Sequence, residues 1–244
     1  MRTIRIHVDA DLAAGSEIIL PAQAAAHVAR VLRLRAGDRV SLFNGDGNDY
    51  AAELIAATPR EARARVLEAQ ANRSESPLRI VLAQALARGE KMDWIVQKAT
   101  ELGVVEIVPL LTARSEVKLD DNRAPKRQEH WRGVAISACE QSGRARVPAV
   151  GAVQSLREWL SALDPDAAAT RLALLPEGET RARELRIEGS AILAIGPEGG
   201  FDEGDSALLR NAGFKGLRLG PRVLRTETAG LAAIAALQAL FGDG

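Results

Sequence analysis

Apolar and polar residues alternate with a period of two in several short runs of the first 70 positions. This alternation is typical of β-strands that bury one face, and it occurs in "TIRIHV", in "SEIIL" and on both sides of Gly45-Asp46-Gly47. The glycine pair between two such runs predicts a hairpin. One helix is expected over residues 22–34. Several short strands with turn signals predict a small β-barrel.

Beyond this module the pattern changes. Residues 68–77, "EAQANRSESP", are polar without a period and predict a linker. Continuous apolar runs then alternate with helical patterns, which are expected at residues 90–102, between Asp121 and Gln141, and after Ser155, where Glu158 completes a capping box. The runs are "LRIVLAQAL", "VEIVPLL", "RLALLP", "AILAIGP" and "GLRLG". Apolar strands separated by helices predict an α/β fold with a mostly parallel sheet covered on both faces.

Three of these runs end in loops with unusual chemistry. They are Pro176-Glu177-Gly178, "AIGPEGGFDEGD" and "LGPRVLRTETA". Ligands of parallel sheets bind beyond the carboxyl ends of strands, so these loops could share one pocket. Asp202 is expected to cap the next helix, with Glu203 and Asp205 in its first turn. A helix start carrying these carboxylates would repel phosphate, which favours a neutral or cationic cofactor.

Composition narrows the class of protein further. Basic and acidic residues balance at 32 each, and the single cysteine excludes an internal disulfide. The three histidines have no metal-ligand spacing, and no "GxxxxGK[ST]" phosphate loop occurs, so we expect no metal. There is no apolar run of membrane-spanning length and no secretory signal at the start, so we expect a cytoplasmic protein without a membrane partner. Arginines cluster at Arg30, Arg33, Arg35 and Arg39, as a phosphate-binding patch or simply as a solvated face.

Three motifs carry a resemblance to a known family. "AIGPEGGF", "LGPRVLRTETA" and "ACEQSGR" together resemble the RsmE family of ribosomal RNA uridine methyltransferases, within the SPOUT superfamily. The resemblance includes "WIVQKATELGV" and "ARSEVKL" and extends over nearly the full length. It is specific because the "GPEGG" and "RTETA" motifs occur together at this spacing.

The resemblance implies a fold and a reaction. Residues 1–72 would form a PUA-like RNA-binding β-barrel and residues 73–244 a SPOUT α/β domain, with a deep trefoil knot and the cofactor site at about 172–244. It implies S-adenosylmethionine as cofactor, a homodimer, and methylation of uridine N3 in the decoding region of 16S ribosomal RNA, within the small ribosomal subunit.

The chemistry of the transfer suggests roles for further residues. Arg225 would hold the uridine carbonyl or its phosphate, and Glu227 or Glu198 would be the base, with compensation of the helix dipole as the alternative role of Glu227. Three further residues would complete the site, some of them across the dimer, or are ordinary polar surface residues: Arg114, Gln141 and Arg144. The RNA-binding residues would be the four clustered arginines. The cofactor-binding residues would be Leu175, Pro176, Glu177, Ile195, Gly196, Pro197, Gly199, Gly200, Leu217, Leu219, Gly220, Val223, Leu224, Thr226, Thr228 and Ala229.

Other functions are compatible with parts of the chain. A non-catalytic RNA-binding protein would need only the barrel, but it would leave three polar strand-exit loops without a role. The chemistry of the residues does not separate uridine N3 from another RNA target or from the ribose 2′-oxygen, which only the family resemblance decides. A small-molecule enzyme of nucleotide-binding type is disfavoured by the missing phosphate loops.

Overall fold

The computed structural model describes residues 4–116, 123–165, 167–175 and 177–244 and divides the chain into two compact units. The first unit comprises Met1–Glu75 together with Cys139–Val147, and the second comprises Ser76–Ala138 and Pro148–Gly244. Nothing in the hydrophobic pattern indicated that Cys139–Val147 returns to the first unit. The contacts that hold this return segment are long-range, such as the bond from Asn72 Nδ2 to the Gly143 carbonyl at 3.0 Å.

The first unit is built on a five-stranded sheet with the order β1-β3-β4-β5-β2. Its strands are β1 (Arg5–His7), β2 (Glu17–Ile19), β3 (Arg39–Phe43), β4 (Asn48–Ala57) and β5 (Ala62–Ala71). Strands β3 and β4 pair antiparallel across Gly45 and Gly47, whose φ angles of 93° and 99° suit glycine, so the predicted hairpin is confirmed. The predicted linker is wrong in its first half, because β5 continues to Ala71 and pairs with β4 there.

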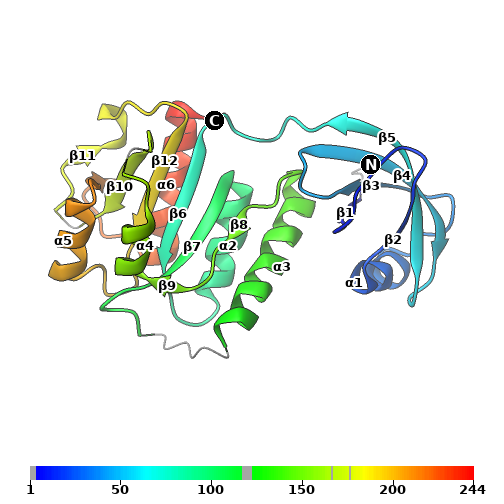
Figure 1. Cartoon of the computed structure of the whole chain (residues 1–244), viewed down its shortest axis with the longest axis horizontal. Helices are drawn as coiled ribbons and strands as arrows, with labels where there is room; N and C mark the ends of the chain where they lie inside the picture. Colours follow the sequence, from blue (N-terminus) through cyan, green and yellow to red (C-terminus); the bar gives the residue numbers. More distant parts are fainter. Residues whose placement is uncertain (1–3, 117–122, 166, 176) are drawn as a thin grey trace. The chain divides into compact units, whose positions relative to one another are not determined.

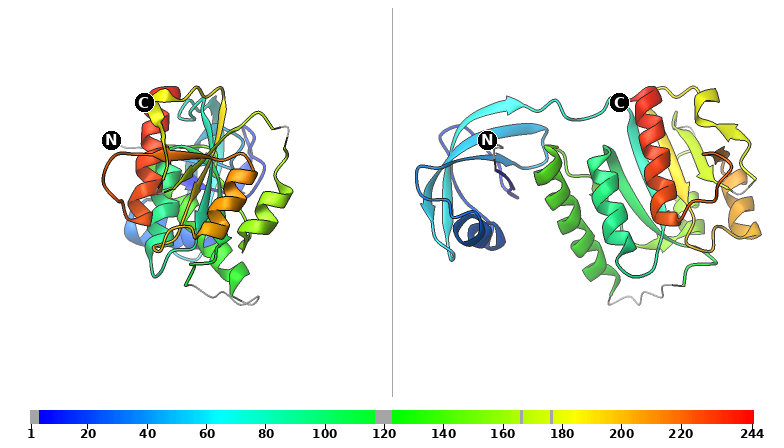
Figure 2. Two further views of the ribbon diagram at one scale, coloured as in Figure 1. Left: turned by 90° about the vertical axis from the view of Figure 1, so that its left-hand side faces the viewer. Right: turned by 180° about the vertical axis from the view of Figure 1, so that it is seen from behind.

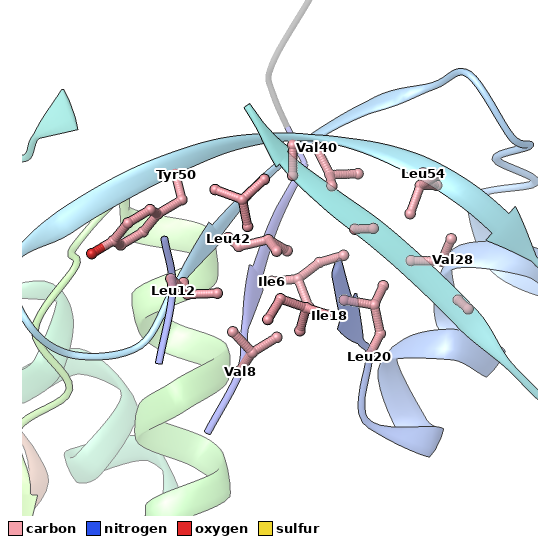
Figure 3. Packing of buried hydrophobic residues seen from close by; sticks show 14 of the residues in the cluster. Ile6, Val8, Leu12, Ile18, Leu20, Val28, Val40, Leu42, Tyr50 and Leu54 are labelled. Atoms are coloured by element: carbon pink, nitrogen blue, oxygen red, sulfur yellow. The ribbon is translucent and has the colours of Figure 1, made fainter. Parts of the chain in front are cut away.

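Alternating side chains of these strands form one apolar core (Figure 3). On β4, for example, Tyr50, Ala52 and Leu54 are buried while the residues between them are not. The helix expected at residues 22–34 starts as predicted but divides into α1 (Ala22–Ala26) and one turn of π-helix (His27–Val31). It ends early because Arg33 adopts a left-handed conformation with φ of 55°.

The second unit contains a parallel sheet with the order β11-β13-β10-β12-β6-β7-β8, and β9 also pairs with β7. All of its pairings are parallel, which confirms the predicted sheet type. Its strands are β6 (Arg79–Ala85), β7 (Val104–Leu111), β8 (Ala149–Val150), β9 (Gln154–Ser155), β10 (Thr170–Leu174), β11 (Thr180–Arg181), β12 (Ser190–Ile195) and β13 (Lys215–Arg218). Strands β13, β10, β12 and β6 are neighbours, so the loops that leave their carboxyl ends lie along one edge.

Helices cover both faces of this sheet. They are α2 (Lys91–Glu101), α3 (Ala124–Ser142), α4 (Leu156–Ala162), α5 (Glu203–Asn211) and α6 (Thr226–Phe241), with a short 3₁₀ turn at Ala182–Glu184. Helices α2 and α6 pack together on one side of the sheet, and α4 and α5 lie on the opposite side (Figures 1 and 2). The predicted α3 start near Asp121 falls outside the described residues. The capping box of α4 is confirmed: Ser155 Oγ accepts from the Glu158 N–H, and Glu158 Oε2 accepts from the Ser155 N–H.

The sequence predicts neither a membrane-spanning segment nor a metal site. No helix in the described part of the chain has the length and apolarity needed to cross a bilayer. Within the same described ranges, no three His, Cys, Asp or Glu side chains gather as a metal-binding group.

Candidate active site

A cavity of about 810 Å³ lies in the second unit, at the carboxyl ends of β10, β12 and β13. This volume is in the range of small-molecule sites. Its walls come from the segments after these three strands and from the start of α6. The lining residues are Leu174, Leu175, Glu177, Gly178, Glu179, Arg181, Gly196, Pro197, Glu198, Gly199, Gly200, Leu217, Arg218, Leu219, Gly220, Pro221, Arg222, Val223, Leu224, Thr226 and Ala229.

The structure brings most of the predicted cofactor-binding residues to this cavity. Two of them do not line it: Ile195 is buried within β12, and Thr228 is exposed on the first turn of α6. A third, Pro176, lies outside the described residues. The contact of the others with a cofactor stays a prediction.

Glycines shape the cavity in two ways. At Gly200, with φ of 68°, and at Gly220, with φ of 139°, an added Cβ would meet no protein atom within 4 Å, so the backbone there faces open space. At Gly178 the opposite holds, because a Cβ would lie 2.7 Å from the Leu217 carbonyl oxygen. Gly196 is equally confined, with the Phe201 nitrogen at 2.9 Å. The wall therefore consists of closely packed backbone with room for a ligand beside it, which fits a cofactor held by main-chain groups.

A buried hydrogen-bonded bridge joins the loop after β12 to the first residue of α6. Thr226 Oγ1 donates to the Gly196 carbonyl at 2.6 Å and accepts from Gln84 Nε2 at 3.1 Å. Gln84 also donates to the Ala85 carbonyl at 2.9 Å. Gln84 is fully buried and Thr226 nearly so. Buried polar groups of this kind are costly to leave unpaired, so the bridge fixes the position of the turn relative to the helix.

Carboxylates already occupy the start of α5. Asp202 Oδ1 accepts from the Asp205 N–H at 2.7 Å, which confirms the predicted cap. Asp205 in turn accepts from the Ala113 N–H at 3.1 Å, and burial raises the pKa of its carboxyl group. With Glu203 also in the first turn, the positive end of this helix is compensated. The arrangement suits a neutral or cationic ligand better than a phosphate.

The two candidate bases share one lysine. Glu198 lines the cavity, and its Oε1 accepts from Lys91 Nζ at 2.9 Å and from the Arg88 N–H at 3.1 Å. Burial raises the pKa of Glu198, but the hydrogen bonds from Lys91 and Arg88 lower it by more, so the pKa falls below its ordinary value. Glu227 lies outside the lining, with its Oε2 3.4 Å from Lys91 Nζ. That oxygen is buried and makes no hydrogen bond within the described ranges.

Two candidate arginines lie in the same unit. Arg114 Nη1 donates to the Gly199 carbonyl at 2.8 Å, so it contacts the turn that lines the cavity. Arg225 is the N-cap residue of α6 and is exposed, one position before the cavity-lining Thr226. Its guanidinium makes no hydrogen bond or ion pair with any residue that the structure describes.

The remaining two candidates belong to the first unit. Gln141 is exposed near the end of α3. Arg144 is buried, and its Nη2 and Nε bind the carboxylate of Glu75 at 2.7 and 3.2 Å. The structure therefore gives Arg144 a partner within the first unit.

The clustered arginines also belong to the first unit. The side chains of Arg30, Arg33, Arg35 and Arg39 are all exposed. Within the part of the chain that the structure describes, none of the four forms an ion pair. Four unneutralised guanidinium groups on one small unit are suited to phosphate contacts.

Sequence reasoning missed several residues at this site. Glu179 and Arg181 line the cavity without having been singled out. Gln84 had a signal, since it is a polar residue within a continuous apolar run. Lys91 had none, because its partners are more than a hundred positions away.

Comparison with known proteins identifies the family. A family model described as an RNA methyltransferase domain matches residues 74–238, and a model described as an RNA methyltransferase PUA domain matches residues 20–67. The ribosomal RNA small subunit methyltransferase E of Bacillus subtilis is 36% identical over 86% of this chain and 85% of its own length. The chain belongs to this family. The resemblance to the RsmE family is thereby confirmed, including its α/β fold with an N-terminal PUA-like domain.

Two solved methyltransferase structures superpose closely on this chain. A ribosomal RNA small subunit methyltransferase E from Neisseria gonorrhoeae, bound to S-adenosylmethionine, has a TM-score of 0.94 at 38% identity and covers 99% of both chains. A methyltransferase from Legionella pneumophila, also with S-adenosylmethionine, has a TM-score of 0.94 at 37% identity and covers 100% of both chains. The cofactor implied by the resemblance is thus present in two relatives of the family.

Proposed function

We propose that this chain is an S-adenosylmethionine-dependent methyltransferase that modifies the N3 position of a uridine in the decoding region of 16S ribosomal RNA. The observation that carries the proposal is the glycine-walled cavity at three neighbouring strand ends, within the part of the chain that matches the methyltransferase family model. Relatives of the same fold bind S-adenosylmethionine.

The cavity suits this cofactor in its geometry and its charge. Backbone groups near Gly200 and Gly220 face open space and can approach a ligand closely. Glu177, Glu179 and Glu198 line the cavity together with Arg181, Arg218 and Arg222, so it can meet both the cationic and the anionic groups of a zwitterionic amino-acid moiety. S-adenosylmethionine carries no phosphate group, which agrees with a helix start at α5 that already carries carboxylates.

The transfer needs groups that act on the uracil. When bound, S-adenosylmethionine supplies an electrophilic methyl group on a sulfonium. N3 of uracil becomes a nucleophile only after its proton leaves, so a carboxylate must accept that proton. Glu198 lines the cavity and is the proposed proton acceptor. Glu227, which pairs with the same Lys91, is the alternative acceptor. The exposed guanidinium of Arg225 would stabilise charge on a uracil carbonyl oxygen or hold the phosphate, with Arg114 supporting the turn at Gly199.

The proposal includes partners and a topology. The barrel with its four free arginines would bind 16S ribosomal RNA within the small ribosomal subunit, the enzyme would act as a cytoplasmic homodimer, and Gln141 and Arg144 would contribute across that dimer. Residues 172–244 would form a deep trefoil knot. Two backbone segments within this range approach closely, since a Cβ at Gly216 would lie 2.9 Å from the Gly178 Cα.

Methyl transfer to isolated ribosomal particles tests the function. The protein is incubated with small subunits that lack the modification and with methyl-labelled S-adenosylmethionine, and the product is mapped by mass spectrometry. The expected result is one methyl group on the base of a single uridine. A label on a ribose would support a 2′-oxygen methyltransferase instead, and RNA binding without any label would support a non-catalytic binder.

Arg225→Ala tests the assignment of the polar segment. Removing a donor to developing charge lowers kcat by about a hundredfold. Arg157→Ala, at an exposed arginine of α4, is the matched control and should keep the wild-type rate. Equal rates for the two variants would remove Arg225 from the mechanism.

A further inference from the structure

Lys91 lies outside the three strand-exit loops, at the first position of α2, yet it binds two segments next to the cavity. Its ammonium group is 2.9 Å from Glu198 Oε1, on the turn after β12, and 3.4 Å from Glu227 Oε2, on the first turn of α6. The side chains of Lys91 and Glu198 are both 30% exposed and that of Glu227 is 20% exposed, so solvent screens these pairs only in part. The three charges form one group, defined here as the lysine clasp.

The clasp offsets a repulsion that the fold creates. Glu198 and Glu227 are both within ion-pair distance of the same nitrogen, so their carboxylates would face each other without a counter-charge if Lys91 were absent. The hydrogen bond to Glu198 raises the pKa of Lys91, which further favours its charged form. The neighbouring Arg88 guanidinium pairs with Glu116, and only the Arg88 backbone N–H reaches Glu198.

The clasp and the buried Thr226 bridge act on the same turn at different points. Thr226 holds the turn at Gly196, where it leaves β12. Lys91 holds it two residues further, at Glu198, beside Gly199 and Gly200 of the cavity wall. Loss of the clasp therefore leaves the base of the turn anchored at Gly196 and weakens the hold on the part that faces the ligand, where the bonds from the Arg88 N–H to Glu198 and from Arg114 to Gly199 remain.

We propose that Lys91 is a positioning residue of the cofactor site, which clasps Glu198 and Glu227 so that the turn after β12 and the start of α6 present one preformed wall to S-adenosylmethionine. The inference rests on the proposed function only in that the cavity binds this cofactor. Lys91 itself does not line the cavity, so its effect is exerted through the two carboxylates.

Calorimetric titration with S-adenosylhomocysteine tests the clasp without requiring turnover. Lys91→Met should weaken binding about tenfold, because a charge-assisted bond that orders the wall is lost. Lys91→Arg keeps the charge and should restore the affinity to within about twofold of wild type. Lys98→Met is the matched control: Lys98 is on the same helix, is also 30% exposed and pairs with a glutamate, but that partner, Glu101, does not line the cavity as Glu198 does.

A double-mutant cycle makes the test specific. Glu198→Ala removes the other half of the stronger bond, and the double variant with Lys91→Met should bind no more weakly than either single variant. Additive losses, a Lys91→Met affinity within twofold of wild type, or an equal loss in Lys98→Met would each overturn the proposal. Melting temperatures are recorded in parallel. If Lys91→Met does not fold, the affinities of Lys91→Arg and Glu198→Ala for S-adenosylhomocysteine test the proposal instead.

The outcomes also separate this inference from the proposed function. If wild-type protein binds S-adenosylhomocysteine and Thr226→Val weakens that binding while Lys91→Met does not, only the role of Lys91 fails. If wild-type protein does not bind the ligand, the proposed cofactor site fails and the clasp fails with it.

Discussion

Replacement of Thr226 by valine removes the hydroxyl at the centre of the buried bridge while keeping the side-chain shape. The Gly196 carbonyl loses its donor at 2.6 Å, and one N–H of Gln84 loses its acceptor at 3.1 Å. Gln84 keeps its bond to the Ala85 carbonyl, so only one of its two N–H groups is left unpaired. Helix propensity hardly changes between threonine and valine, and the hydroxyl does not cap α6.

The magnitude follows from the burial of these groups. Each buried polar group that loses its partner costs about 1–3 kcal/mol, and no cavity is created because the volumes match. Two such groups give an expected loss of about 2–6 kcal/mol from the free energy of unfolding of the second unit. The affinity for S-adenosylhomocysteine should fall as well, because the bridged turn lines the cavity.

Urea denaturation followed by tryptophan fluorescence measures this loss in the right unit. All three tryptophans, Trp94, Trp131 and Trp159, belong to the second unit, so the signal reports its unfolding. Thr228→Val, on the same helical turn but exposed, is the control and should change stability by less than about 0.5 kcal/mol. If Thr226→Val also stays within 0.5 kcal/mol of wild type, the reasoning about the bridge is refuted.

Three further predictions concern other parts of the chain. Gly178→Ala should destabilise the second unit and weaken cofactor binding, because the new Cβ would lie 2.7 Å from the Leu217 carbonyl oxygen. Gly133→Ala is the control and should be neutral or stabilising, because a Cβ there, on α3, would meet open space. Thermal melts compare the two variants, and equal changes in melting temperature would contradict the packing argument. Burial raises the pKa of the Cys139 thiol to about 12. At pH 8 a thiol reagent should therefore label the native protein at least about a hundredfold more slowly than the unfolded protein, and rapid labelling of the native protein would exclude a buried thiol. Burial raises the pKa of Asp46, but the hydrogen bonds that its carboxylate accepts, above all from Tyr50, lower it by more. The stability that the ionised carboxylate contributes is therefore present above pH 3.8 and is lost as the pH falls below that value. Acid unfolding of Tyr50→Phe should begin at a higher pH than that of wild type, and an unchanged acid midpoint would refute this.

Local features of the fold could be predicted because their causes are local in sequence. The capping box at Ser155 and Glu158 needs only two side chains three positions apart, and Asp202 caps α5 in the same way. The parallel sheet was predictable because strands buried on both faces are apolar along their whole length. The strand exits were predictable as candidate loops because their glycines and charges interrupt these apolar runs.

What could not be predicted depends on contacts between distant residues. The return of Cys139–Val147 to the first unit has no periodic signal, and its bonds, such as the ion pair of Arg144 with Glu75, link segments about seventy positions apart. The clasp of Lys91 with Glu198 is of the same kind. The extension of β5 through Ala71 was missed because its last residues are exposed to solvent, and exposed polar residues at the end of a strand have the same composition as a linker. Conversely, Ile195 and Thr228 were assigned to the cofactor site from the family resemblance, and neither lines the cavity.

The central claim is that the glycine-walled cavity after β10, β12 and β13 holds the methyl donor. The most direct measurement is a crystal structure of this chain with S-adenosylhomocysteine. The account predicts the ligand in the cavity of about 810 Å³, against the backbone of Gly200 and Gly220. Ligand bound elsewhere, for instance in the neighbouring cavity that includes Arg183 and Leu240, with Gly200 free of contact, would contradict it.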